Sequence, residues 1–288
     1  MNLQFITAAT PKIGQGHVYR TIALAKEMEK RGHNYTIAAT PDTVGGEIVW
    51  ANVPSAHGLL SYSEIDCYIL DIPGPHHYIP YVWKTIYLDW TGDEQYDGAA
   101  IELCALKICQ GIPFGKPNAD NEKAGFEYAI LWPDVVEHRG QERKEQVFFY
   151  SSQHNELTDR VLKLLESTGI KVVQPQPGTA RSTELLASSA VAVTFGGMTC
   201  LEACCLGIPQ VAIITGPKHE LQINHLASRE ALWGLADHSL EMLYTLISFL
   251  LNSWKNKPIT YEKMSNMAME VIDGKGVYRV ADAIESLV

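Results

Sequence analysis

The sequence predicts an α/β fold made of two Rossmann-like domains. The chain has 288 residues, which is more than one hydrophobic core usually organises. Short apolar runs of strand length alternate with helical patterns in both halves of the chain. A polar, charge-mixed stretch at residues 132–146 separates the two halves. We therefore expect an N-terminal domain over residues 1–140 and a C-terminal domain over residues 141–288.

The N-terminal half begins with a pattern typical of a βαβ unit. The run LQFITAA predicts a strand, and apolar residues then recur at helical spacing from Val18 to Met28 until Gly32 ends the helix. The run NYTIAAT predicts a second strand, which the crossover helix makes a parallel neighbour of the first. Two further runs, CYILDI and KTIYLDW, continue the predicted sheet.

The second half repeats this alternation. Strands are predicted at VFFYSS, IKVVQP, AVAVTF and QVAIIT. Helices are predicted between them, over residues 157–165, near residues 183–187 and from residue 199 onward. The charged stretch at residues 132–146 is interpreted as a solvated loop that links the domains.

Charge and composition limit the classes of partner. A formal net charge of −10 disfavours broad contact with nucleic acid or an anionic membrane surface, although a local basic groove is compatible with it. We find no apolar run of about 18 residues and no signal-peptide pattern, so we expect a cytoplasmic protein without stable membrane insertion. The six cysteines contain no CxxC pair, so buried reduced thiols are expected and no metal site is predicted.

The loop GQGHVYR supplies the first candidate site residues, Gly14, Gly16 and His17. In parallel α/β sheets, ligands bind beyond the carboxyl ends of the strands, where this loop is expected. Its glycines allow a close backbone approach, and an imidazole there can act as a general base. Alternatively, His17 caps the helix or packs beside the loop, and Arg20 faces either the same crevice or water. A dinucleotide fingerprint is not complete, because Tyr19 replaces its third glycine.

A second glycine loop precedes another predicted helix. Its residues are Gly196, Gly197, Met198 and Thr199. A helix N-terminus of this kind can hold a diphosphate. Thr199 and Glu202 have the spacing of a capping box, which is a structural explanation for the carboxylate. In the functional alternative, Glu202 accepts hydrogen bonds from the hydroxyl groups of a ribose.

Together these motifs resemble the GT-B superfamily of nucleotide-sugar enzymes. The resemblance rests on GQGHVYR with ALAKEMEKRGH, and on GGMTCLEACCLGIP followed by PKHELQINHLA. Within the superfamily the chain is similar to the group that contains the lipid II-forming N-acetylglucosaminyltransferase and the UDP-sugar hydrolase of pseudaminic acid biosynthesis. GxGHxxR, FEYAILWPDV and DGKGVYRVADAI are similar to the hydrolase. The resemblance covers nearly the whole chain and implies two Rossmann-like domains that face each other across a cleft.

The resemblance also implies roles for individual residues. His17 matches the base that activates the attacking group, and residues 196–199 match the loop that holds the nucleotide diphosphate. Glu202 matches the acidic residue that binds the ribose. Asn224 falls where related transferases end a polar run that faces the sugar, and Gln222 lies beside it, with a spacing that departs from that pattern.

The implied donor is a nucleotide diphosphate sugar, in the first instance a UDP-sugar, with no further cofactor and no obligatory metal. The chain departs from the hydrolase pattern at YSSQHN, where a GGTD-like loop is typical, and at LDW, where Asp89 stands without a second aspartate. These departures favour a glycosyltransferase in which His17 deprotonates an acceptor hydroxyl. A UDP-sugar hydrolase and a non-catalytic nucleotide-sugar-binding protein are the alternatives.

The acceptor is expected to contact the segment DIPGPHHYIPYVW. Its residues His76, His77 and Tyr78 carry rings that can stack on a ring-shaped acceptor, or they can simply anchor the loop. The acidic chain favours a small-molecule, carbohydrate or lipid-linked acceptor, and a modified nucleobase remains open.

Overall fold

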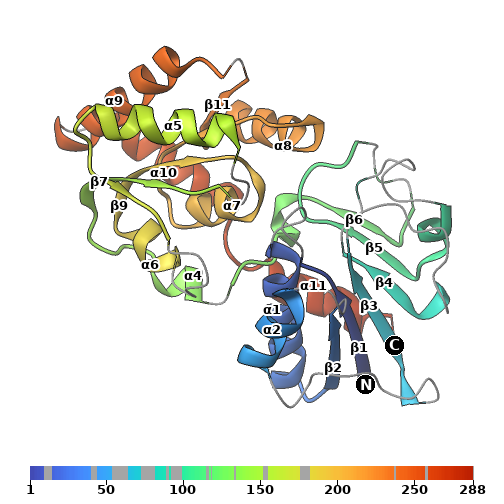
Figure 1. Ribbon diagram of the computed structural model, residues 1–288. Coiled ribbons are helices and arrows are strands. Elements are labelled where there is room, and N and C mark those ends of the chain that lie inside the picture. The colour runs from blue at the N-terminus through green and yellow to red at the C-terminus, as the bar shows by residue number, and fades with distance from the viewer. Residues whose placement is uncertain are drawn as a thin grey trace. The chain divides into compact units, whose positions relative to one another are not determined.

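In the computed structural model of the protein, the described residues are 1–9, 15–39, 44–53, 64–72, 82–88, 91, 99–114, 117, 119–132, 134–151, 155–175, 182–236, 238–256 and 259–287. They form two compact units (Figure 1). Unit 1 comprises Met1–Trp132 and Lys275–Val288, and unit 2 comprises Pro133–Gly274.

Unit 1 contains a parallel sheet with the strand order β2-β1-β3-β4-β5-β6. Its strands are β1 (Asn2–Thr7), β2 (Asn34–Ala39), β3 (Cys67–Asp71), β4 (Thr85–Tyr87), β5 (Leu106–Cys109) and β6 (Glu122–Ala124). Its helices are α1 (Gly16–Lys30), α2 (Val44–Asn52) and α11 (Gly276–Glu285), with short 3₁₀ turns η3 (Val82–Lys84), η4 (Ala99–Leu103) and η5 (Phe126–Tyr128). Strand β3 is buried along its whole length because it lies inside the sheet, between β1 and β4.

Unit 2 contains a second parallel sheet with the strand order β11-β10-β9-β7-β8. Its strands are β7 (Lys144–Phe149), β8 (Val172–Val173), β9 (Ser189–Thr194), β10 (Gln210–Ile213) and β11 (Trp233–Leu235). Its helices are α4 (Asp134–Glu137), α5 (Glu156–Ser167), α6 (Ser182–Ala187), α7 (Gly197–Cys205), α8 (Pro217–Ser228), α9 (Leu240–Asn256) and α10 (Ile259–Val271). Two parallel sheets with helical crossovers confirm the predicted α/β class.

The structure divides the chain differently from the expected boundary at residue 140. Unit 2 begins at residue 133, because α4 packs against α7. The last segment returns to unit 1, where α11 lies beside α1 (Figure 1). Val280 and Ile284 of α11 are buried in the same hydrophobic cluster as Leu3 and Phe5 of β1. The apolar face of α11 therefore completes the first core.

The charged stretch at residues 132–146 is not a solvated linker. It contains α4 and the beginning of β7, and two of its arginines bind backbone carbonyl groups at the end of α7. Arg139 donates to the carbonyl oxygen of Cys205 at 2.8 Å, and Arg143 donates to that of Gly207 at 2.8 Å. The last carbonyls of a helix have no partner within it, so Arg139 satisfies that of Cys205. Arg143 binds the carbonyls just beyond, those of the C-cap residue Leu206 and of Gly207.

All six cysteines are buried and carry free thiols. Burial is the main cause that raises the pKa of Cys67 to about 12, and that of Cys104 likewise to about 12. Across the described ranges, no three His, Cys, Asp or Glu side chains gather into a group that could hold a metal ion. None of the helices in the described part of the chain combines the length and the apolar character that a bilayer crossing requires.

Candidate functional site

The first candidate site lies where β1 and β3 end in unit 1. These strands are parallel neighbours, and their last residues, Thr7 and Asp71, stand opposite each other. The chain beyond β1 leads into α1, which begins at Gly16 and has His17 as its second residue. The fold therefore brings His17 and Asp71 to the same edge of the sheet, although 54 positions separate them in the sequence.

Asp71 is the centre of a hydrogen-bonded cluster. Its Oδ1 atom lies 2.8 Å from Nδ1 of His17 and accepts a further hydrogen bond from Nη2 of Arg20. Its Oδ2 atom accepts hydrogen bonds from Nε of Arg20 at 2.7 Å and from Oγ1 of Thr21 at 3.2 Å. Asp71 is fully buried and Arg20 is 8% exposed. Arg20 therefore faces this cluster rather than water, and Gln15, not His17, is the N-cap of α1.

Asp71 is held in its ionised form. Burial alone would raise the pKa of Asp71, but the charges of Arg20 and His17 and their hydrogen bonds outweigh burial and lower it. An ionised carboxylate beside an imidazole orients the ring and stabilises positive charge on it. This arrangement can support an imidazole that accepts a proton at its other nitrogen, Nε2.

The second candidate site lies where β9 ends in unit 2. The chain turns through Gly196 and Gly197, whose φ angles of +81° and +67° belong to the left-handed region that favours glycine. Helix α7 begins at Gly197, and Met198 and Thr199, both partly buried, continue its first turn. The first backbone N–H groups of a helix have no partner inside it, so this turn can bind an anion.

The expected capping box is wrong. Helix α7 begins two residues before Thr199, its N-cap is Gly196, and no side chain makes a capping hydrogen bond there. Thr199 therefore lies inside the helix and cannot act as the N-cap. Glu202 is therefore not part of a capping box.

Glu202 lies one turn farther along α7 and is partly buried. Burial, together with the charge of Asp134, raises the pKa of Glu202 to about 7. Asp134 is the first residue of α4, which packs against α7. At neutral pH the carboxyl group of Glu202 is therefore present in both its protonated and its ionised forms, and either form can bind a hydroxyl group.

An imidazole lies against the second glycine turn. A methyl group on Gly196 would be 3.0 Å from Cγ of His219, so the ring packs closely on this turn. Nδ1 of His219 lies 3.0 Å from the hydroxyl oxygen of Thr215. Burial, followed by the charge of Lys218, lowers the pKa of His219, which is therefore neutral at pH 7.

The two polar residues of the predicted sugar-binding run do not share one face of α8. Residues two apart on a helix point in different directions, so Gln222 and Asn224 diverge. Gln222 follows His219 by three residues and lies on the same side of the helix, whereas Asn224 is exposed. Of the two, only Gln222 lies on the side of α8 that carries His219.

Comparisons with known proteins identify the fold. No family model and no curated protein matches this sequence. Among solved structures, MurG from Acinetobacter baumannii is 13% identical with a TM-score of 0.61, and the match covers 99% of each chain. A putative UDP-N-acetylglucosamine 2-epimerase from Listeria monocytogenes is 14% identical with a TM-score of 0.65, and the match covers 99% of this chain and 96% of that one. The match to HepE from Anabaena, solved in complex with UDP, covers 99% and 100% at 14% identity with a TM-score of 0.62. The chain has the GT-B fold.

In this GT-B fold the first glycine loop belongs to unit 1 and the second belongs to unit 2. Several predicted residues lie outside the described residues: Gly14, His76, His77, Tyr78 and Asp89. The hypothesis that residues 76–78 contact an acceptor therefore stays a prediction.

Two residues of these sites are not evident from the sequence alone. There, Asp71 is only the first residue of the predicted acceptor segment, and His219 only lies beside the polar run that ends at Asn224. An acidic residue that ends a buried strand was the available signal for Asp71, because ligands of such sheets bind at that edge. The signal became specific only with the pairing of β1 and β3, which places Asp71 beside α1.

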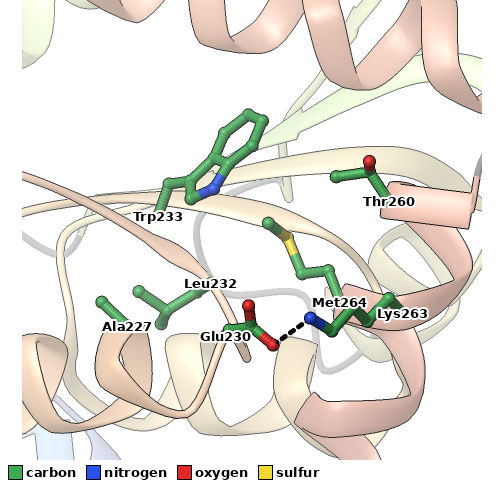
Figure 2. A pocket seen from close by; sticks show the side chains of 7 residues that line it. All are labelled: Ala227, Glu230, Leu232, Trp233, Thr260, Lys263 and Met264. Carbon is green, nitrogen blue, oxygen red and sulfur yellow. Dashed lines mark ion pairs between the residues drawn. The ribbon is translucent and has the colours of Figure 1, made fainter.

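Unit 2 also contains a pocket that does not include the second glycine turn (Figure 2). It has a volume of about 120 Å³ and is lined by Ala227, Glu230, Leu232, Trp233, Thr260, Lys263 and Met264. Glu230 and Lys263 form an ion pair across it at 2.5 Å. Trp233 is the first residue of β11, so the pocket lies at the amino end of this strand, opposite to the edge where ligands of GT-B sheets are expected. The pocket is therefore separate from the second glycine turn, which follows the carboxyl end of β9.

Proposed function

We propose that the protein is a glycosyltransferase that takes a sugar from a nucleotide diphosphate donor, in the first instance a UDP-sugar. Unit 2 binds the nucleotide, and His17 of unit 1 is the general base that activates an acceptor hydroxyl. The hydrogen-bonded pair of His17 and Asp71 carries this proposal. An imidazole backed by a buried, ionised carboxylate at the carboxyl edge of a parallel sheet is well suited to accept a proton.

The features of unit 2 support a nucleotide diphosphate as its ligand. The Gly196–Gly197 turn places free N–H groups and the positive end of the α7 dipole at one point, which favours a diphosphate. The imidazole of His219 adjoins this turn and can donate a hydrogen bond to a phosphate oxygen. Glu202, on the same helix, can accept hydrogen bonds from ribose hydroxyls. A solved structure with the same fold contains UDP.

The proposed reaction moves one proton and exchanges one bond. Nε2 of His17 takes the proton of the acceptor hydroxyl, whose oxygen attacks the anomeric carbon of the sugar. The bond between that carbon and the diphosphate oxygen breaks, and the electron pair leaves with the diphosphate. Backbone N–H groups of the second glycine turn stabilise the growing negative charge. Asp71 stabilises the imidazolium that forms at His17.

A panel of nucleotide diphosphate sugars, offered with and without candidate acceptors, tests this proposal. We expect UDP to bind, donor cleavage to be slow without acceptor, and a matching acceptor to raise it by at least about tenfold with formation of a glycosylated product. Mass spectrometry follows both UDP and the product. Fast release of free sugar without acceptor would assign the protein as a hydrolase. Tight binding of the donor without any turnover would assign a binding protein.

A further inference from the structure

His238 of unit 2 has an unusual backbone conformation. Its φ angle of +52° belongs to the left-handed region, which residues with a Cβ atom rarely adopt. Among the described residues other than glycine, Glu230 is the second with a positive φ angle, at +59°. Glu230 follows the C-cap of α8, where a left-handed residue commonly ends a helix. His238 follows strand β11 instead, so the end of a helix does not explain its conformation.

The imidazole of His238 binds a backbone carbonyl group at the carboxyl edge of the second sheet. Its Nε2 atom lies 2.6 Å from the carbonyl oxygen of Ile214. A carbonyl oxygen only accepts, so Nε2 carries the hydrogen of this bond. The N–H group of Ile214 donates to the carbonyl oxygen of Leu235, the last residue of β11, at 2.9 Å. Both backbone groups of Ile214 are therefore held by β11 and the segment that follows it.

Ile214 directly follows β10 and closely precedes α8, which carries His219 in its first turn. Nδ1 of His219 lies 3.0 Å from the hydroxyl oxygen of Thr215, and the ring packs on Gly196. Among the described residues, no side chain makes a capping hydrogen bond at the beginning of α8. The cap therefore does not fix where this helix begins, and the position of the His219 ring depends on how Ile214 is held.

These contacts connect three neighbouring segments at one edge of the sheet. Strands β9, β10 and β11 are parallel neighbours, so their carboxyl ends lie at the same edge. The segment after β9 contains Gly196, the segment after β10 contains Ile214 and leads to His219, and the segment after β11 contains His238. The third segment holds the second, and the second packs on the glycine turn of the first.

A glycine would adopt the backbone conformation of His238 without the steric cost of a Cβ atom. Strained residues persist where the surrounding structure holds them, and they cluster at ligand sites. We propose that His238 is a positioning residue for the nucleotide diphosphate site. Through the carbonyl group of Ile214 it fixes the beginning of α8, and with it the imidazole of His219 against the second glycine turn. Its effect on UDP rests on the proposed function, whereas its effect on the position of His219 does not.

Carbon–proton NMR of the histidine rings tests this proposal without any ligand. The spectrum of His219→Ala identifies the signals of His219. In His238→Gly the backbone keeps a conformation that suits glycine, but the imidazole is absent. The His219 signals should then shift or broaden, because the beginning of α8 is no longer held. Unchanged His219 signals in this variant would overturn the proposal.

His238→Gln tests the hydrogen bond itself and guards against loss of folding in His238→Gly. The amide nitrogen of glutamine reaches about as far as Nε2 of histidine and can donate to Ile214. This variant should therefore keep the wild-type His219 signals, and displaced signals in the folded variant would contradict the role of the bond. His138→Asn is the matched control, because Nδ1 of His138 lies 3.2 Å from a side-chain oxygen of Gln141 in the same unit. The control should leave the His219 signals unchanged, and an equal displacement there would show that the effect is not specific to His238.

Calorimetry of UDP binding measures the functional effect. His238→Gly should weaken UDP binding by about fivefold or more, because the imidazole of His219 is no longer held beside the diphosphate. In the His219→Ala background the same substitution should change UDP affinity by less than about twofold, because the group that it positions is already absent. Unchanged UDP affinity in His238→Gly, or equal losses in both backgrounds, would overturn the proposal. If the wild-type protein binds no UDP, the proposed nucleotide site fails, and the His219 signals still decide the role of His238.

Discussion

Individual side chains of this protein act through pairs whose members lie far apart in the sequence. His17 is hydrogen-bonded to Asp71, which is 54 positions away. The charge of Asp134, which lies on another helix, contributes to the raised pKa of Glu202. In each pair a buried or partly buried charge changes what its neighbour can do. Each pair therefore gives a separate prediction at the level of single residues.

The first prediction concerns His17→Ala. Loss of the imidazole removes the proposed general base, so the rate of sugar transfer should fall by roughly 100-fold or more. Binding of UDP should be nearly unchanged, because the proposed nucleotide site belongs to unit 2. Steady-state kinetics and calorimetry of UDP binding measure the two effects. His33→Ala is a matched control, because His33 also binds a carboxylate, that of Glu285, in unit 1. Turnover at the wild-type rate in a folded His17→Ala variant would exclude His17 as the base.

The second prediction concerns the pH dependence of stability. The pKa of Glu202 in the folded protein, about 7, lies above the value of 4.5 expected for an unperturbed glutamate. Between these two values the folded state binds more protons than the unfolded state, so the free energy of unfolding falls as the pH rises through this window. Glu202→Gln cannot lose a proton and should remove this fall, which makes the variant more stable than the wild type by roughly 1–3 kcal/mol at about pH 8.

Urea unfolding at about pH 5 and about pH 8 measures this difference. At the lower pH the carboxyl group is largely protonated in the folded state, and the variant should resemble the wild type. A gain in stability of the same size at both pH values would show that removal of the charge is not the cause.

At the scale of elements, α7 connects the second glycine turn to the core of unit 2. Its N-terminus is the proposed diphosphate site, and its C-terminal carbonyl groups are bound by Arg139 and Arg143. These cations also lie at the negative end of the helix dipole, which they stabilise. The helix is therefore held at one end while the other remains available for a ligand.

The third prediction tests this anchoring. Arg143 donates hydrogen bonds to the carbonyl oxygens of Leu206 and Gly207 and to the hydroxyl group of Tyr261. Arg143→Ala leaves these groups with fewer partners and should lower the free energy of unfolding by about 1–3 kcal/mol. Urea denaturation measures the loss. Arg160→Ala, on the exposed side of α5, should change stability little. Equal effects of the two substitutions would exclude a specific role for Arg143.

The helices and strands show which parts of the fold could be predicted from the sequence. The periodic residues from Val18 to Met28 predicted a helix, and the structure has α1 over Gly16–Lys30. Strands β3, β4, β9 and β10, which are buried along their whole length, were likewise predicted from short apolar runs, because parallel strands are apolar on both faces. Strand β5 is equally buried and was not predicted. Arg139 and Arg143 were interpreted as part of a solvated loop, because charged residues usually face water. Their carbonyl partners come from a helix more than 60 positions away, and no local pattern reveals such a pairing.

In the candidate sites, too, residues with a local signal could be found from sequence and residues placed by long-range packing could not. The second glycine turn could be found from sequence, because glycine at a strand-to-helix turn has a local conformational reason. Gly14 of the first glycine loop lies outside the described residues. Asp71 and His219 could not be assigned, because their roles depend on the register of β3 and on the packing of α8 against Gly196. The start of α7 was misplaced because Thr199 and Glu202 imitate a capping box.

At the scale of the whole molecule, the chain builds unit 1 from both of its ends. After unit 2 is complete, residues 275–288 return and place α11 against α1. Arg31 at the end of α1 donates hydrogen bonds to Asp282 and Glu285 of α11, and His33 also contacts Glu285. Unit 1 therefore cannot complete its core until the last part of the chain has been made.

The last prediction concerns the residue at which this return begins. Gly276 is the first residue of α11, and a methyl group there would lie 2.1 Å from the carbonyl oxygen of Ala129. A backbone atom cannot move aside as a flexible side chain can, so Gly276→Ala should displace α11 from the core of unit 1. We expect a loss of about 3 kcal/mol or more in the free energy of unfolding, which is at the upper end of what overpacking costs.

Thermal melting and urea unfolding of Gly276→Ala measure this loss. Gly216→Ala is the matched control, because its backbone is extended and a methyl group there meets no atom within 4 Å. Gly216 is the N-cap of α8, where alanine is less favourable than glycine, so the control should lose no more than about 1 kcal/mol relative to the wild type. Since Gly276 belongs to unit 1, the proposed nucleotide site in unit 2 should keep its UDP affinity below the melting temperature of the variant. Wild-type stability in Gly276→Ala would show that α11 is not held at this point, and that the core of unit 1 does not depend on the return of the chain.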